Sequence, residues 1–195
     1  MKKLILLLTL SILTFASTLP ATSVVKIFTA SSSSNYNLPW QTPQISNYIG
    51  SGAIIEGNRI LTSAHVVSGA KFIEVQKEND SKKYIANLKY ISDQADLAII
   101  EVDDKTFFDK TKALKLNENI KTRDQITVLG YPLGGQTIST TTGVVSRIEY
   151  TSYVWSNEYL LAIQVDAAIN SGNSGGAAID KNGDLVGIAM MRLTN

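Results

Sequence analysis

Three residues whose side chains could together carry out acyl transfer occur in this chain in the order His65, Asp96 and Ser174. Ser174 lies in the segment Asn170-Ser-Gly-Asn-Ser-Gly-Gly176, close to the C-terminal end. A serine hydroxyl becomes a nucleophile when a base can take its proton, and glycines let backbone N–H groups converge on a developing oxyanion. The chain has a single histidine, so His65 is the natural candidate for that base.

Each of these three signals has a plain structural alternative. His65 follows a short apolar run and a Thr-Ser-Ala turn, where a histidine is more often structural than catalytic. Asp96 opens an apolar run, where an aspartate is usually a turn former, and Asp93 is an alternative acid nearby. Ser174 could be a hairpin residue. Their joint presence in this order favours a Ser–His–Asp hydrolase, in which the carboxylate orients the imidazole. The N–H groups of Gly172 and Ser174 would then form the oxyanion hole.

The segment Gly172-Asn-Ser-Gly-Gly176 also fits the G-x-S-x-G elbow of lipases and esterases. In that class the serine precedes both the acid and the histidine. No histidine follows Ser174 here, and Ala177–Val186 has the pattern of a hairpin rather than of a helix. Chain order therefore excludes the esterase interpretation.

Composition excludes several other classes of function. The chain has 195 residues, of which 44% are hydrophobic and 18% charged, enough for one large domain or two small barrels. A net charge of +1 gives no electrostatic case for binding nucleic acid. With no cysteine and one histidine, disulfides and a catalytic zinc site are not expected. We expect neither a metal nor an organic cofactor.

The N-terminal 21 residues have the pattern of an export signal. Met1-Lys2-Lys3 is a short basic head, Leu4–Phe15 is apolar, and cleavage is expected after Ala16 or, less typically, after Ala21. The apolar run is shorter than the roughly 20 residues of a membrane-spanning helix. The sequence therefore predicts a signal peptide over residues 1–21, a periplasmic protein and no stable membrane span after cleavage, with an uncleaved anchor as the alternative.

The rest of the chain predicts an all-β fold. Eleven short apolar, β-branched or aromatic runs recur without long amphipathic helices, which is typical of barrels or a sandwich. The predicted strands are 24–28, 48–55, 59–61, 72–75, 84–91, 97–102, 126–129, 143–148, 159–165, 177–179 and 185–190. Ser31–Asn47 is interpreted as a long surface loop. The charged stretch Asp103–Asp124 is interpreted as a connection between two β halves, with one helical turn that buries Phe107 and Phe108.

Three segments resemble the catalytic blocks of the HtrA/Deg family of trypsin-like serine proteases. They are Thr62-Ser-Ala-His65, Asp96-Leu-Ala-Ile-Ile100 and Asp166-Ala-Ala-Ile-Asn-Ser-Gly-Asn-Ser-Gly-Gly176, and Gly130–Gly135 and Thr142–Ser146 are similar to family segments too. The resemblance implies two six-stranded antiparallel β-barrels. Residues 22–103 would form the first barrel, with His65 and Asp96, 104–119 the connection, and 120–195 the second barrel, with Ser174.

The same resemblance implies a function. Family members cleave unfolded or damaged proteins without ATP, often as trimers, so unfolded polypeptides are the expected partners and a homotrimer the expected assembly. Tyr36 and Trp40 lie where the family carries a variable loop and are candidates for self-association. The substrate pocket would be formed by Ala168, Ile169, Ala189, Met190 and Met191. Since no acidic residue occurs there, we expect cleavage after small or medium apolar residues.

The sequence departs from the family pattern at its end. The sequence ends at Asn195, where the family fold has a further strand and a C-terminal helix, and no PDZ domain follows. We therefore expect a second barrel that is incomplete at its C-terminus. This departure supports an alternative function, a catalytically incomplete, chaperone-like binder of unfolded polypeptides.

Overall fold

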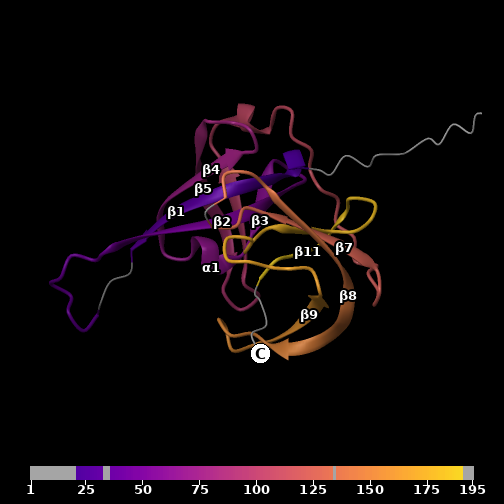
Figure 1. The fold of residues 1–195 in the computed structure, drawn as a ribbon. Coiled ribbons are helices and arrows are strands. Elements are labelled where there is room, and N and C mark those ends of the chain that lie inside the picture. The colour runs from indigo at the N-terminus through magenta and orange to yellow at the C-terminus, as the bar shows by residue number, and fades with distance from the viewer. Residues whose placement is uncertain (1–20, 33–35, 134, 191–195) are drawn as a thin grey trace, which may run out of the picture.

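The structure is a computed structural model that describes residues 21–32, 36–133 and 135–190. It consists of two antiparallel β units joined by an extended connection (Figure 1). The expected signal peptide over residues 1–21 lies almost wholly outside the described residues, as does Met191 of the expected substrate pocket.

The first unit is a closed six-stranded barrel with the strand order β1-β2-β3-β6-β5-β4. Its core consists of aliphatic and aromatic side chains that alternate along the strands, as expected for residues with a period of two. Because the sheet closes on itself, every strand has two partners and the barrel has no free edge. The strands are β1 (Val24–Ser32), β2 (Ile45–Ile55), β3 (Arg59–Thr62), β4 (Ala70–Lys77), β5 (Lys83–Ser92) and β6 (Leu97–Val102).

The second unit is a curled sheet of five strands with the order β11-β10-β7-β8-β9. In the described residues β9 and β11 are edges, so this unit is a half-barrel rather than a closed barrel. The expectation of an incomplete second barrel is confirmed, and the family count of six strands is not reached in these residues. The strands are β7 (Gln125–Gly130), β8 (Ser139–Ser152), β9 (Tyr159–Val165), β10 (Ala177–Ile179) and β11 (Leu185–Ile188).

Helical structure is limited to single turns in the described residues. These are η1 (Ala21–Ser23), α1 (Ala64–Val67) and η2 (Lys105–Phe108). The turn η2 lies in the connection and buries Phe107 completely, with Phe108 packed beside it, as the sequence predicted. Parallel bridges from Leu114 to Ile55 and from Leu116 to Leu185 join the connection to both sheets. None of the helices in the described residues is long and apolar enough to cross a membrane.

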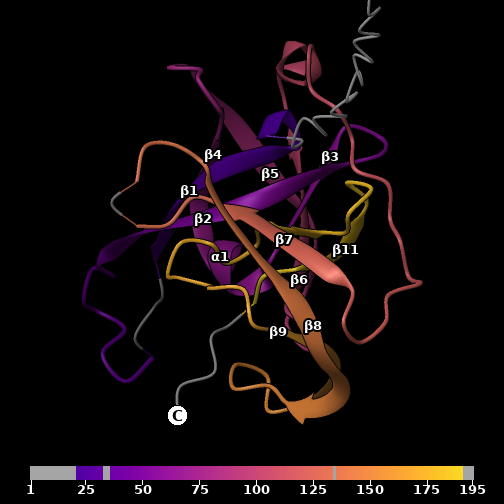
Figure 2. The same cartoon turned by 45° about the vertical axis from the view of Figure 1, so that its right-hand side comes forward.

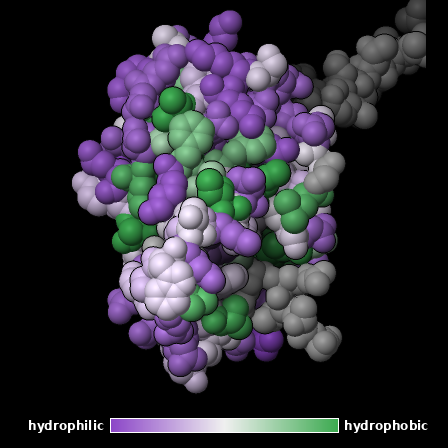
Figure 3. All heavy atoms as spheres, turned by 90° about the vertical axis from the view of Figure 1, so that its left-hand side faces the viewer, coloured by the Kyte–Doolittle hydropathy of each residue, from purple (hydrophilic) through white to green (hydrophobic). Residues whose placement is uncertain are grey.

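The predicted loop Ser31–Asn47 is shorter than expected. Strands β1 and β2 stay paired as an extension to the end of β1, with Ser31 opposite Ser46 and Ser32 opposite Ile45. Serine has low β propensity, but the ladder continues because the partner strand supplies backbone hydrogen bonds. Figure 1 shows this extension projecting from the barrel. Tyr36 and Trp40 near its tip are exposed. The space-filling view in Figure 3 shows one face of the molecule, on which apolar side chains are interspersed with polar ones.

Candidate active site

His65 and Asp96 lie side by side at one end of the first barrel. The turn α1 begins two residues after β3, and β6 begins directly after Asp96; β3 and β6 are neighbours, with Thr62 opposite Ala98. The distance from His65 Nδ1 to Asp96 Oδ2 is 2.7 Å. Because a carboxylate oxygen only accepts, Nδ1 carries the proton and Nε2 is left as the basic nitrogen. This is the tautomer that a general base for serine requires.

Asp96 is held by more than this one contact. Its main chain has φ of 50°, its carbonyl oxygen accepts from Ala64 N at 3.1 Å, and its Oδ1 accepts from His65 N at 2.8 Å. Only 2% of Asp96 is exposed. Burial alone would raise the pKa of Asp96, but hydrogen bonds from His65 and Tyr153 hold it below its ordinary value. The alternative acid, Asp93, is exposed and accepts from Asp96 N through its carbonyl oxygen.

The connection between β8 and β9 brings two aromatic residues to the same pair. The Tyr153 hydroxyl donates to Asp96 Oδ2. The Trp155 ring lies parallel to the His65 ring, with an interplanar angle of 1° and a centroid distance of 5.3 Å. Figure 2 shows the long strand β8 that leads to this connection. Neither residue was predicted from the sequence, because nothing in the segment Tyr153–Glu158 indicates that it lies against the first barrel.

Ser174 lies in a tight turn between β9 and β10. Asn173 N donates to Asn170 O at 2.9 Å and Gly176 N to Asn173 O at 2.8 Å. Gly175 has φ of +81°, and a Cβ there would lie 2.2 Å from Ser51 O, so no larger residue fits. Gly172 has φ of +97° and is equally crowded by the backbone of Tyr131. The glycines therefore let this turn approach the first barrel at backbone distance.

The N–H groups of Gly172 and Ser174 are available to a ligand. Within the described part of the chain, neither amide donates a hydrogen bond. Two such amides two positions apart on a glycine turn are the arrangement that an oxyanion hole uses. In the same residues Ser174 Oγ makes no hydrogen bond to His65. The structure thus brings His65 and Asp96 together directly, and it places Ser174 without a bond to that pair.

Ser51 joins the Ser174 turn to the first barrel. Its N donates to Ser174 O at 2.8 Å, and its Oγ donates to Gly172 O at 2.8 Å while accepting from Tyr131 N at 2.8 Å. Thr62 Oγ1 in turn donates to Ser51 O at 2.7 Å. Ser51 is fully buried. The serine turn is therefore positioned by strand β2 as well as by its own sheet, and no pattern in the sequence predicted this contact.

Of the expected pocket residues that the structure describes, Ala189 is bonded directly to this turn. Ala189 N donates to Gly176 O at 2.9 Å, and Ala189 O accepts from Gly175 N at 2.8 Å. Ile169 packs against the same apolar cluster as Ala189. Ala168 is exposed, with its carbonyl oxygen bonded to Thr141 Oγ1, and Met190 is half-buried. Ala189 and Ile169 thus belong to one apolar cluster, whereas Ala168 is exposed.

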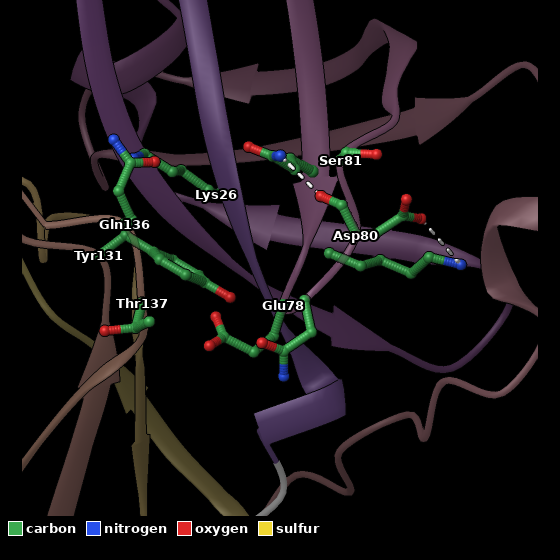
Figure 4. A pocket seen from close by; sticks show the side chains of 10 residues that line it. Lys26, Glu78, Asp80, Ser81, Tyr131, Gln136 and Thr137 are labelled. Carbon is green, nitrogen blue, oxygen red and sulfur yellow. Dashed lines mark hydrogen bonds and ion pairs between the residues drawn. The ribbon is translucent and has the colours of Figure 1, made fainter.

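A separate cavity of about 280 Å³ lies between the first barrel and the loop after β7 (Figure 4). Its lining includes Lys26, Glu78 and Tyr131 and none of the three proposed catalytic residues. Lys26 Nζ donates to Gly135 O at 2.9 Å and Glu78 Oε2 accepts from Ile138 N at 3.2 Å. These bonds fasten the loop to the barrel. Among the described residues no group of three or more His, Cys, Asp or Glu could hold a metal ion.

A histidine bonded to a buried aspartate on one β unit, with a serine in a glycine turn on the next, is the arrangement of a serine peptidase built from two β units. A family model for the trypsin-like peptidase domain matches residues 50–188. The chain is 44% identical over 170 residues to Protease Do-like 4, mitochondrial, of Arabidopsis thaliana, covering 87% of this chain and 33% of that protein. It is 42% identical over 165 residues to the serine protease DegP homolog of Plasmodium falciparum, covering 85% and 19%.

Solved structures agree with these relatives. The HtrA-type protease AlgW with decapeptide matches with a TM-score of 0.72 and 30% identity, covering 90% of this chain and 57% of that one. The active form of the Rv3671c protease from M. tuberculosis matches with a TM-score of 0.73 and 25% identity, covering 88% and 70%. The chain belongs to the trypsin-like peptidases, among the Do-like (HtrA) proteases. It spans about a third or less of the length of the curated relatives named above.

Proposed function

We propose that this chain is the protease domain of a serine endopeptidase that cleaves unfolded or damaged proteins. The observation that carries the proposal is the pair in which His65 Nδ1 lies 2.7 Å from Oδ2 of the buried Asp96, because it leaves Nε2 as a base for serine. Ser174 Oγ attacks the scissile carbonyl carbon and its proton passes to His65 Nε2. The carbonyl oxygen takes the negative charge and is bound by the N–H groups of Gly172 and Ser174.

Collapse of this intermediate completes the chemistry. The C–N bond breaks, the imidazolium gives its proton to the leaving amine, and an acyl ester on Ser174 remains. Water then attacks the ester, with His65 again as the base, and Ser174 is regenerated. A Ser174 Oγ that makes no bond to His65 in the free protein is consistent with this role, because catalytic hydrogen bonds often tighten only when substrate binds.

The proposed substrates are extended, unfolded segments with small or medium apolar residues before the scissile bond. Ala189 and Ile169 belong to one apolar cluster, Ala189 is bonded to the serine turn, and no acidic residue among the proposed pocket residues would hold a basic side chain. The test is digestion of unfolded casein followed by sequencing of the products. We expect cuts after residues such as valine and alanine in casein, and none in a folded control protein. Preferential cuts after arginine would contradict the proposed pocket.

A non-cutting binder of unfolded chains is the second candidate. One observation favours it, the second sheet that is half-open in the described residues. Such a protein would suppress aggregation of unfolded casein and leave it intact. Wild type and Ser174→Ala would then behave alike, whereas the protease proposal expects only the variant to leave casein intact.

Location and assembly are further proposals. The basic, apolar N-terminal sequence supports export to a periplasm, which sequencing of the mature N-terminus would test. The exposed Tyr36 and Trp40 on the β1–β2 extension support self-association as a homotrimer. We expect Trp40→Ser to lower the mass measured by light scattering to that of a monomer. A wild type that is already monomeric at high concentration would contradict the trimer.

A further inference from the structure

Backbone hydrogen bonds within the connection between β8 and β9 fix the position of Tyr153. Tyr153 N donates to Glu158 O and Asn157 N donates to Tyr153 O, both at 2.8 Å. Asn157 closes the turn with φ of 56°, a conformation that asparagine tolerates better than most residues. Tyr153 is 2% exposed although its neighbours Val154 and Trp155 are 76% and 67% exposed. Its side chain therefore points inward, away from the solvent that surrounds the rest of the connection.

The inward-pointing hydroxyl ends on the acid of the proposed catalytic site. It bonds Asp96 Oδ2, the same oxygen that faces His65 Nδ1. Burial, the hydrogen bond to Asp96 and the charge of that carboxylate all raise the pKa of Tyr153. The phenol is therefore protonated at neutral pH, and because a carboxylate oxygen only accepts, the phenol is the donor in this contact.

Asp96 needs such support for two reasons. Its main chain lies in the left-handed region, where a residue without glycine's freedom persists only if its surroundings fix it. Its Oδ1 already accepts a hydrogen bond from His65 N in α1, so only Oδ2 faces the imidazole. A small rotation of the carboxyl group would break that contact. In the described residues the titratable side chains bonded to this carboxyl are His65 and Tyr153. Tyr153 comes from the other β unit, 57 positions away.

We propose that Tyr153 is a positioning residue of the catalytic site, one that holds the Asp96 carboxylate toward His65 and takes part of its negative charge. The proposal rests on the proposed function for its effect on turnover, but the contact itself does not. Without the hydroxyl, the carboxylate gains rotational freedom, so fewer molecules hold the imidazole in the productive tautomer. The carboxylate also keeps its full charge, which stabilises the imidazolium more strongly.

The test compares wild type, Tyr153→Phe and the control Tyr150→Phe, whose ring lies on β8 and is exposed. Since the chain contains a single histidine, its imidazole resonances can be followed by NMR without ambiguity. In Tyr153→Phe we expect the imidazole to lose its proton at higher pH, and the acid limb of kcat/KM to move the same way. We also expect kcat to fall about tenfold with little change in KM, as for a lost hydrogen bond to a charged group. Tyr150→Phe should match wild type in all three measurements.

The outcomes separate this proposal from the proposed function. Equal imidazole titrations in wild type and Tyr153→Phe, both folded by circular dichroism, would overturn the role of Tyr153. If wild type has no turnover, the protease proposal fails, and the titration alone still decides whether Tyr153 acts on the pair. A fall in kcat without any displacement of the titration or the acid limb would indicate a purely structural role and would also overturn the proposal.

Discussion

The two β units of this protein differ in closure, and they contribute differently to the proposed site. The first is a barrel in which each of six strands has two partners, and it carries His65 and Asp96 at the ends of adjacent strands. The second is an open sheet in the described residues, and it carries Ser174 on a turn. The His65–Asp96 pair thus lies in the unit whose strands all pair with one another. The nucleophile depends on bonds from Ser51 in the other unit.

The difference shows which contacts make the site work. Closure fixes β3 and β6 relative to each other, so the backbones that carry His65 and Asp96 are placed inside one barrel. Two contacts cross between the units: Ser51 bonds the turn that carries Ser174, and Tyr153 bonds the carboxylate of Asp96. Changes inside the first barrel should therefore alter folding or proton transfer, changes at Ser51 should alter the alignment of Ser174, and changes at Tyr153 should act on the His65–Asp96 pair.

The largest expected effect comes from the acid in the closed unit. Asp96→Asn should lower kcat about 10⁴-fold, because an amide favours the wrong imidazole tautomer. The matched control is Asp93→Asn, an exposed residue in the turn before β6, which should lower kcat less than about twofold. Hydrolysis of a peptide ester by both variants supplies the measurement. Greater damage from Asp93→Asn would show that the acid has been assigned to the wrong residue.

A core substitution should distinguish the units by stability. Phe107→Ala removes a fully buried ring that packs edge-on against Tyr84 at 5.0 Å, and should lower the free energy of unfolding by about 3–5 kcal/mol. Leu161→Ala on the exposed face of β9 should change it by less than about 0.5 kcal/mol. Urea unfolding monitored by circular dichroism measures both. Similar losses for the two variants would mean that the closed barrel is not the main source of stability.

The junction at Ser51 is expected to have a smaller effect. Ser51→Ala leaves Tyr131 N and Gly172 O without their partner, which should lower the free energy of unfolding by about 1–3 kcal/mol. It should also slow reaction of Ser174 with a fluorophosphonate, because the turn loses one anchor. Ser46→Ala, exposed on the same strand, is the control. Unfolding and labelling rates equal to wild type would remove Ser51 from the alignment of the two units.

The edge of the open sheet gives the smallest expected change in stability. Leu161 is 61% exposed on β9, an edge strand in the described residues. Leu161→Lys should leave the free energy of unfolding within about 0.5 kcal/mol of wild type and reduce aggregation, since charges on edge strands oppose strand pairing between molecules. Light scattering at rising concentration is the measurement. Unchanged aggregation would indicate that β9 is not the site of self-association in this form.

The sequence predicted the parts of this molecule that depend on local pattern. Eleven apolar runs became eleven strands, and Leu97–Val102, Tyr159–Val165 and Ala177–Ile179 agree at both ends. The adjacency of His65 and Asp96 could be expected from the family pattern, because the motif specifies residue types and order. The turn that buries Phe107 was predicted because two adjacent aromatic rings in a charged stretch need an apolar surface.

What could not be predicted depends on contacts between distant segments. Tyr153 lies 57 positions from Asp96 and Ser51 lies 121 from Gly172, and no periodicity in the chain relates them. A tyrosine between Ser152 and Val154 looks like a surface residue until the β8–β9 connection is placed beside the first barrel. The extension of β1 and β2 through Ser31 and Ser46 was missed because pairing, not propensity, determines it.

The most direct test of the account is labelling of the folded protein with a fluorophosphonate probe, followed by mass spectrometry of the modified peptide. The account predicts one adduct, on Ser174, formed by wild type and absent from Ser174→Ala. It also predicts that Asp96→Asn reacts far more slowly. A folded wild type that forms no adduct, or an adduct on another serine, would contradict the claim that His65, Asp96 and Ser174 work as one catalytic site.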